Sequence, residues 1–134
     1  MITAVFFDLY GTLAGFSPSR YEIQSAACAD FGIEVTPQGI LAGYALADAY
    51  MARQNAVRPL RRLDAESRDD FFAEYERLVL QGAGVEVPPE KALEIWRRVR
   101  QLPYDLTRFD DVLPAIDMLK LQALRMGLIS NMNR

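Results

Sequence analysis

The stretch VFFDLYGTL, residues 5–13, combines an apolar run with one acidic side chain and a Gly-Thr pair. The run begins at Ile2 and ends at Phe7, and its length and composition predict a buried strand. Strands inside a parallel sheet are apolar throughout, and ligands bind at the carboxyl ends of such strands. Asp8 follows the run directly. Its carboxylate is therefore expected in that crevice, either as a reactive or ligand-bound group or as the cap of the next turn.

The residues after this run resemble motif I of the haloacid dehalogenase (HAD) superfamily, in which four apolar residues precede Asp-x-Asp-x-Thr-Leu or a close variant. Here the motif reads DLYGTL, residues 8–13. The resemblance implies that Asp8 is a nucleophile that forms an aspartyl-ester intermediate, and that Thr12 takes the place of the threonine in the motif. Backbone amides after Asp8 would help to stabilise the negative charge that develops in the reaction.

A second stretch, LISN at residues 128–131, resembles motif II of the same superfamily, an apolar strand that ends in Ser or Thr. The resemblance implies that Ser130 and Asn131 hold the anionic group of a small substrate together with Thr12. Both stretches occur in the order found in the family, and a long segment with helical patterns separates them. By resemblance, the chain is identified as a HAD-like hydrolase.

Tyr10 stands two residues after Asp8, where phosphatase members of the family carry a second Asp as general acid. A phenol is a poor general acid near neutral pH, so the Tyr10 side chain is either a packing residue or a substrate-binding residue. Tyrosine here is similar to the 2-haloacid dehalogenases, in which halide leaves without a proton, and SNMN at 130–133 also resembles their motif II. The resemblance thus implies hydrolysis of a carbon–halogen bond of a small 2-haloacid, without a cofactor.

A different reaction remains open as an alternative to dehalogenation. A phosphatase of a small phosphorylated metabolite would use Mg²⁺, bound by the Asp8 carboxylate and the Tyr10 backbone carbonyl. The dehalogenases also have an arginine near the start of the cap helix that here begins at Thr36-Pro37, and its opening turns carry none. Four later arginines either hold a substrate carboxylate or form a solvated basic loop; they are Arg53, Arg58, Arg61 and Arg62.

The predicted fold class is α/β: a HAD-like Rossmannoid parallel sheet, with only its first two core strands present, and an inserted α-helical bundle cap. Residues 1–16 and 103–134 are assigned to the incomplete core, and residues 17–102 to the cap. Apolar residues recur at helical spacing in four segments of the cap, which begin near Pro18, Pro37, Ala65 and Pro89.

In the predicted core, residues 8–17 are expected to form a Gly-rich turn. Asp110-Asp111 are expected to cap a helix at about 112–124. A second strand is expected at 124–129, so that the sheet has two parallel strands, at 2–7 and 124–129.

The composition excludes several classes of function. The chain has 134 residues and a net charge of −3 without a basic block, which argues against a nucleic-acid partner. It contains no histidine, which excludes His-based triads and His metal sites, and its one cysteine, Cys28, cannot form an internal disulfide. The sequence contains no run of about 18 apolar residues, so no membrane span is expected. The chain begins directly with a strand pattern, so a cytoplasmic location is expected.

The resemblance also implies a Lys or Arg from motif III and acidic residues from motif IV, on strands after motif II. The sequence reaches Arg134 without them. Three explanations are open: a truncated piece of a longer hydrolase, a homodimer or complementing chain that supplies the missing core strands, or a non-catalytic binding module.

Overall fold

In the computed structural model, which describes residues 1–130, strand β1 (Ala4–Phe7) pairs in parallel with β4 (Arg125–Leu128). Ala4 faces Arg125 and Phe7 faces Leu128 in this register. The backbone ladder continues one residue beyond each end of the strands, because Arg125 N donates to Thr3 O and Ile129 N donates to Phe7 O. The predicted parallel pair is confirmed, although both strands are shorter than the expected ranges 2–7 and 124–129.

A second pair of strands was not predicted from the sequence. Strand β2 (Ala14–Ser17) runs antiparallel to β3 (Asp105–Arg108), which corrects the prediction that residues 8–17 form only a turn. The segments AGFS and DLTR carry neither a long apolar run nor a clear alternation. Their strand conformation depends on pairing between segments far apart in the sequence, which a local pattern does not report.

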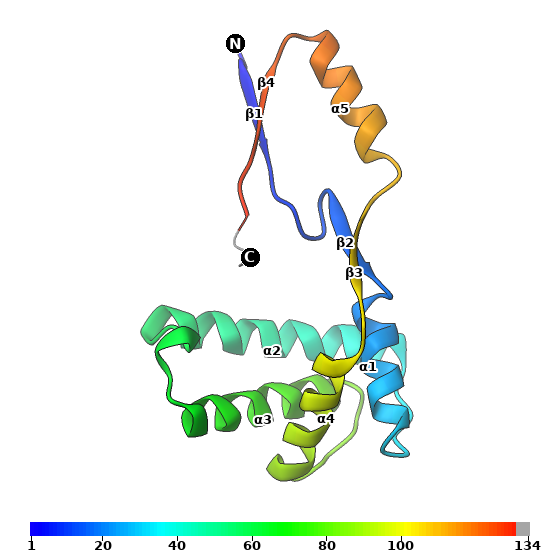
Figure 1. Ribbon diagram of the computed structural model, residues 1–134, viewed down its shortest axis with the longest axis vertical. Helices are drawn as coiled ribbons and strands as arrows, with labels where there is room; N and C mark the ends of the chain where they lie inside the picture. Colours follow the sequence, from blue (N-terminus) through cyan, green and yellow to red (C-terminus); the bar gives the residue numbers. More distant parts are fainter. Residues whose placement is uncertain (131–134) are drawn as a thin grey trace. The chain divides into compact units, whose positions relative to one another are not determined.

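Helix α5 (Val112–Leu121) precedes β4 and supplies the crossover that a parallel pair requires (Figure 1). Asp111 occupies its N-cap position, but its side chain makes no capping hydrogen bond, so the expected capping by this carboxylate is wrong. The helix also ends before residue 124. Ala123 has a φ of 54°, in the left-handed region, which terminates the helical backbone.

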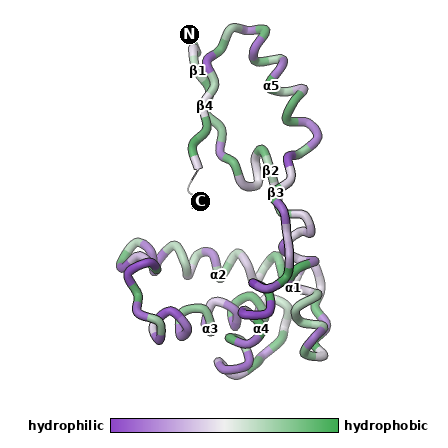
Figure 2. The backbone as a smooth tube through the Cα atoms, viewed as in Figure 1, coloured by the Kyte–Doolittle hydropathy of each residue, from purple (hydrophilic) through white to green (hydrophobic). Residues whose placement is uncertain are grey.

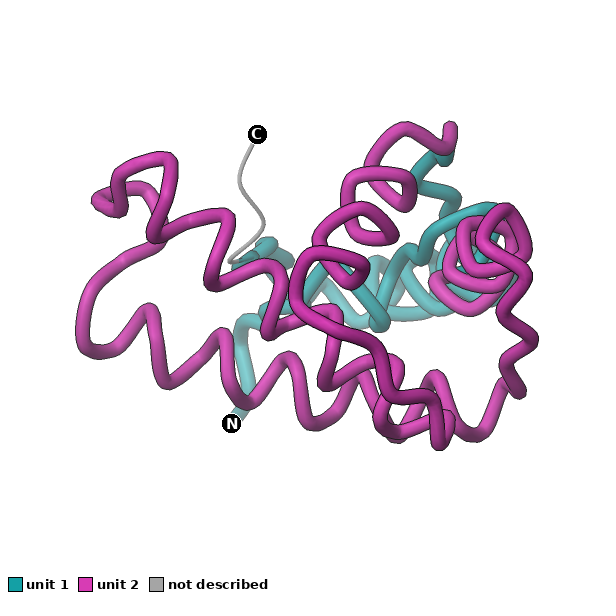
Figure 3. Tube along the Cα trace, turned by 90° about the horizontal axis from the view of Figure 1, so that it is seen from below, with its two compact units in different colours: residues 1–19, 104–134 teal, residues 20–103 magenta. Residues whose placement is uncertain are grey.

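The described chain divides into two compact units (Figure 3). The strand unit comprises residues 1–19 and the chain from Tyr104 onward, and the helical unit comprises Arg20–Pro103. The corresponding ranges expected from the sequence were 1–16 with 103–134, and 17–102.

The helical unit contains four α-helices and one short 3-10 helix. They are α1 (Arg20–Ala29), α2 (Pro37–Val57), η1 (Leu60–Arg62), α3 (Ala65–Gly82) and α4 (Pro89–Gln101). Thr36 caps α2 as expected, because its Oγ1 accepts a hydrogen bond from Gly39 N at 3.2 Å and Pro37 occupies the first turn. Asp64 caps α3 in the same way by accepting from Ser67 N.

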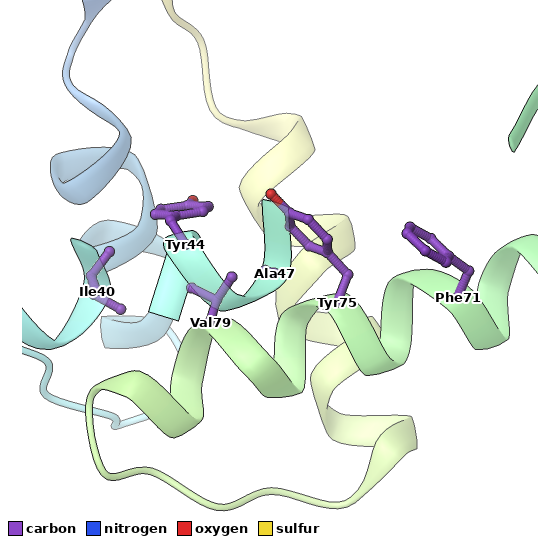
Figure 4. Packing of buried hydrophobic residues seen from close by; sticks show 6 residues of the cluster. All are labelled: Ile40, Tyr44, Ala47, Phe71, Tyr75 and Val79. Carbon is purple, nitrogen blue, oxygen red and sulfur yellow. The ribbon is translucent and has the colours of Figure 1, made fainter. Parts of the chain in front are cut away.

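The core of the helical unit lies between α2 and α3. Figure 4 shows side chains of α3 directed toward α2; the buried cluster consists of Ile40, Tyr44, Ala47, Phe71, Tyr75 and Val79. Phe72 of α3 stacks on Trp96 of α4, with ring centroids 4.0 Å apart, which extends the packing to the fourth helix. The apolar stripe that the sequence places on α2 is therefore a core face.

Glycines allow α2 and α3 to approach each other closely. A Cβ atom at Gly43 would lie 2.0 Å from the Val79 carbonyl oxygen, and one at Gly82 would lie 2.2 Å from Gly43 N. Neither position has room for a side chain without separating the two helices. The contact between these helices therefore depends on glycine at both positions.

Candidate functional site

Asp8 lies directly after β1, and its side chain is exposed. The loop that follows folds around one carbonyl group, since Leu9 O accepts hydrogen bonds from the amides of Thr12, Leu13 and Ala14. Gly11 has a φ of 80° in this loop, a conformation that glycine adopts without the penalty paid by other residues. The Gly-Thr pair next to Asp8 therefore builds a tight turn at the carboxyl end of the strand.

Ser130 lies at the same edge of the sheet as Asp8. The strands β1 and β4 are parallel and in register to Phe7 and Leu128, so their carboxyl ends meet at one edge (Figure 1). The bond from Ile129 N to Phe7 O, at 2.8 Å, carries this pairing past the end of β4. Ser130 follows with an exposed side chain. Asn131, the other residue predicted at this position, lies outside the described residues.

The Tyr10 ring packs within the strand unit. Its centroid lies 4.7 Å from that of Phe16, and the Phe16 ring lies 4.7 Å from that of Tyr104. The side chain thus belongs to an aromatic row formed with β2 and the residue before β3. This geometry favours packing over acid catalysis for the phenol, and a contact with substrate stays a prediction.

Thr12 has an exposed side chain and lines a small hollow of about 120 Å³. The other lining residues are Phe7, Leu13, Asp111, Val112, Ala115 and Ile116. Most of them are apolar and belong to β1 and α5, so the hollow suits an apolar group rather than a charged substrate. Asp8 does not line it, and the hollow is therefore not the crevice predicted around the nucleophile.

The described part of the chain offers few ligands for a metal ion. Within residues 1–130, no three Asp, Glu, His or Cys side chains gather as a group that could hold one. Mg²⁺ commonly takes one or two carboxylates and completes its shell with water and substrate oxygens. In the phosphatase alternative, the protein oxygens would come from the Asp8 carboxylate and the Tyr10 carbonyl, and the rest would come from substrate and water.

The four arginines considered as carboxylate ligands all belong to the helical unit. Arg53 is in α2, Arg58 follows its last residue, and Arg61 and Arg62 are in η1. All four side chains are exposed. They form a basic surface at the connection between α2 and α3.

The helical unit also holds a buried polar group that sequence reasoning missed. Gln24 and Glu76 are 0% and 1% exposed, and Gln24 Nε2 donates a hydrogen bond to Glu76 Oε1. Tyr44 OH donates to Gln24 Oε1 at 3.1 Å, so the three side chains join α1, α2 and α3. Burial raises the pKa of Glu76 from 4.5 to about 7, although the Gln24 hydrogen bond acts in the opposite direction. Burial likewise raises the pKa of the Cys28 thiol.

A second polar group anchors the start of α1. Arg20 donates two hydrogen bonds to Asp48, at 2.9 and 3.1 Å, and its guanidinium lies 3.7 Å from the centroid of the Tyr44 ring. Tyr75 OH donates to Asp48 Oδ1 at 2.7 Å. Burial favours the neutral Asp48 carboxyl, but the bonds from Arg20 and Tyr75 outweigh it and lower the pKa of Asp48.

The helical spacing of the sequence already places polar residues of both groups at positions that face the core. Arg20 and Gln24 lie on the same face of α1 as buried Ala27 and Cys28, and Glu76 lies one turn before buried Leu80. Polar residues at core positions must be paired when buried. Their pairing with one another crosses between helices, and the sequence alone does not identify the partner.

Comparison with known protein families and with curated proteins identified no relative of the chain. No model of a known protein family matches the chain, and no curated protein matches it. None of the helices within residues 1–130 is both long and apolar enough to cross a membrane. The interpretation of the site therefore depends on the residues themselves.

Proposed function

We propose that the chain is a HAD-like hydrolase in which Asp8 is the nucleophile and a small 2-haloacid is the substrate. The observation that carries the proposal is the parallel register of β1 and β4, with Asp8 and Ser130 following the two strands at one edge. Ligands of open α/β sheets bind at this edge. The exposed carboxylate of Asp8 is accessible to a substrate from solvent.

The reaction has two displacement steps in this proposal. An Asp8 carboxylate oxygen bonds to C2 of the haloacid, while the carbon–halogen bond breaks and halide leaves with the bonding electrons. Water then adds to the carbonyl carbon of the aspartyl ester, which releases the 2-hydroxy acid, regenerates the Asp8 carboxylate and frees one proton. Halide needs no general acid, which agrees with a Tyr10 ring that packs against Phe16.

The remaining residues would bind the carboxylate of the substrate. Thr12 and Ser130 supply hydroxyl donors at the carboxyl ends of β1 and β4, and Asn131 follows Ser130 in the sequence. The amides of residues 11–14 donate to carbonyl groups inside the turn, so further donors for developing negative charge would be the amides of Leu9 and Tyr10. Completion of the sheet by a second copy or another chain stays a prediction, which the native mass of the protein tests directly.

The first test is the substitution Asp8→Asn. We expect halide release from 2-chloropropionate to fall at least about 1,000-fold, because an amide is a poor nucleophile. The fold should not change, since the Asp8 side chain is exposed. The matched control is Asp110→Asn, an exposed acid in the same unit that precedes α5, which should keep the wild-type rate.

The fate of oxygen distinguishes this mechanism from direct hydrolysis. In a single turnover in ¹⁸O-labelled water, the label should enter Asp8, and the first product should carry unlabelled oxygen in its hydroxyl group. Label in the first product would contradict the nucleophile. Turnover of p-nitrophenyl phosphate with Mg²⁺, without release of halide, would favour the phosphatase. If the wild-type chain turned over neither substrate, a truncated, catalytically incomplete fragment or a binding module would be the better description.

A further inference from the structure

The connection between α2 and α3 concentrates positive charge on an acidic chain. Between Asp48 and Asp64 the sequence carries four arginines and no acidic residue. The whole chain has 15 Lys and Arg against 18 Asp and Glu; without these four arginines the balance is 11 against 18, a net charge of −7. We call this surface the arginine turn; it consists of Arg53, Arg58, Arg61 and Arg62.

These arginines form no ion pair with a carboxylate, unlike three arginines of α3 and α4. Arg77, Arg97 and Arg98 each bind a carboxylate at 2.6–2.7 Å. Among the described residues, no carboxylate lies within 4.0 Å of a guanidinium nitrogen of the arginine turn. Asp64 is the nearest acid in the sequence; its carboxylate accepts hydrogen bonds from Ser67 as the cap of α3, and the Arg58 charge acts on it only from a longer distance.

The backbone that presents the arginine turn is held by its own hydrogen bonds. Leu60 N donates to Asn55 Oδ1 at 3.0 Å, and Gln54 Nε2 donates to Arg58 O at 2.9 Å. The Arg58 guanidinium donates to Arg62 O at 2.9 Å, which brings these two residues together. A turn ordered before binding loses little conformational entropy when a partner docks.

An apolar side chain stands within the same surface. Val57 ends α2 next to Arg58 and is 89% exposed. In Figure 2 the connection between α2 and α3 is coloured mainly as hydrophilic. A partner that covers this surface therefore meets guanidinium groups beside one aliphatic contact.

We propose that the arginine turn docks a short acidic segment of a partner protein, with carboxylates on the arginines and an aliphatic side chain on Val57. Guanidinium groups match carboxylates with two parallel hydrogen bonds, which gives the contact both charge and geometry. The surface spans one turn of a chain whose remainder has a net charge of −7. A long polyanion such as nucleic acid would extend onto that acidic remainder and be repelled, whereas a short segment would not.

The test is binding of a labelled peptide, Glu-Glu-Leu-Asp-Glu, to the full chain by fluorescence anisotropy. The triple variant Arg58→Gln, Arg61→Gln and Arg62→Gln should bind at least about tenfold more weakly. The matched control, Arg97→Gln, Arg98→Gln and Arg100→Gln on α4, has the same change in net charge and should bind within about twofold of wild type. Circular dichroism establishes that both variants are folded.

Two measurements on the wild-type protein keep the test independent of variant folding. Raising the salt from about 0.01 M to about 0.15 M shortens the Debye length from about 30 Å to about 8 Å and should weaken binding. The neutral peptide Gln-Gln-Leu-Asn-Gln should not bind, and hydrogen exchange should slow at residues 53–62 only with the acidic peptide.

Four results would overturn the proposal. They are unchanged affinity of the triple variant, equal weakening in the α4 control, tighter binding of pyrophosphate or a short oligonucleotide than of the peptide, and self-association at low salt that the triple variant abolishes. The last result would assign the arginine turn to contacts between copies of this chain.

Discussion

The helical unit and the strand unit differ in how many of their apolar side chains are buried. Of the 15 buried hydrophobic residues in the described chain, 13 lie in the helical unit, and only Ala14 and Val112 lie in the strand unit. The exposed large hydrophobics show the reverse, with three in the helical unit and 11 in the strand unit. Phe6 and Leu128 in the parallel strands are 65% and 54% exposed.

The helical unit thus has a buried apolar core, whereas the described residues of the strand unit form none. Helices α2, α3 and α4 bury their apolar faces against one another, which is what an independently stable domain requires. Parallel sheets, by contrast, are normally covered on both faces, and the described strand unit leaves much of its apolar surface in water. The helical unit should therefore be far more stable than the strand unit.

The largest expected effect is a difference in hydrogen exchange between the two units of the full chain. Amides of α2 and α3 should exchange about 1,000-fold or more slowly than amides of β1, β4 and α5, which corresponds to about 4 kcal/mol in opening free energy. The physical reason is the buried apolar area, which opposes opening only in the helical unit.

Hydrogen exchange read by mass spectrometry after proteolysis checks this expectation peptide by peptide. Frayed ends of α2 serve as an internal control, since they should exchange early within a protected helix. Equal protection of both units would contradict the comparison. It would mean that the apolar side chains of β1, β4 and α5 are covered in solution.

The next effect concerns the contact that holds α2 against α3. Gly43→Ala should lower the free energy of unfolding by about 3 kcal/mol or more, because its Cβ would lie 2.0 Å from a backbone oxygen that cannot rotate away. Alanine favours a helix over glycine by roughly 1 kcal/mol, so the steric effect must exceed this gain. Urea unfolding measures the net difference.

The matched control adds a side chain to the exposed face of the same helix. Ala45→Leu should change stability by less than about 0.5 kcal/mol, since Ala45 is exposed and leucine is a good helix former. If Gly43→Ala were as neutral as the control, α2 and α3 would not approach each other as closely as described.

The same contrast explains what the sequence could predict. Thr36-Pro37 and the apolar stripe from Ile40 to Ala47 are local signals, and they correctly predict the start and the core face of α2. The parallel pairing of β1 and β4 was also predicted, because both are short apolar runs followed by turn residues. Strands β2 and β3 were missed because their pairing joins residues about 90 positions apart, which no local pattern encodes.

In the candidate site, local motifs also predicted some residues, whereas contacts between distant segments were missed. Asp8 and Ser130 were predicted from motifs next to strand ends, and the register places both residues at one edge. Tyr10 was left open between packing and substrate, and its contact with Phe16 depends on the β2 strand that the sequence did not reveal. The pairing of Gln24 with Glu76 was equally hidden, since it joins two helices that are 52 residues apart in the chain.

The smallest expected effect is the pH dependence of the helical unit, which tests how well its core tolerates Glu76. The pKa of Glu76 is raised from 4.5 to about 7, so the folded state retains a proton that the unfolded state has lost between these values. Stability should therefore fall as the pH rises from about 4.5 to about 7, by up to about 3 kcal/mol, and should not change further above that range because of this group.

Glu76→Gln should remove this slope, because its amide is nearly isosteric with the neutral carboxyl and does not ionise. Cys28 and Tyr44 are the other titratable groups beside Glu76, and burial raises the pKa of both, so neither should titrate in this window. The control Glu74→Gln alters a half-exposed acid on the same helix, which binds Arg77, and should keep the slope. Urea unfolding at several pH values measures both variants. A slope that survives in Glu76→Gln would assign the pH dependence to other carboxylates. Loss of the slope in Glu76→Gln, together with its persistence in Glu74→Gln, would assign the pH dependence to the buried carboxyl of Glu76.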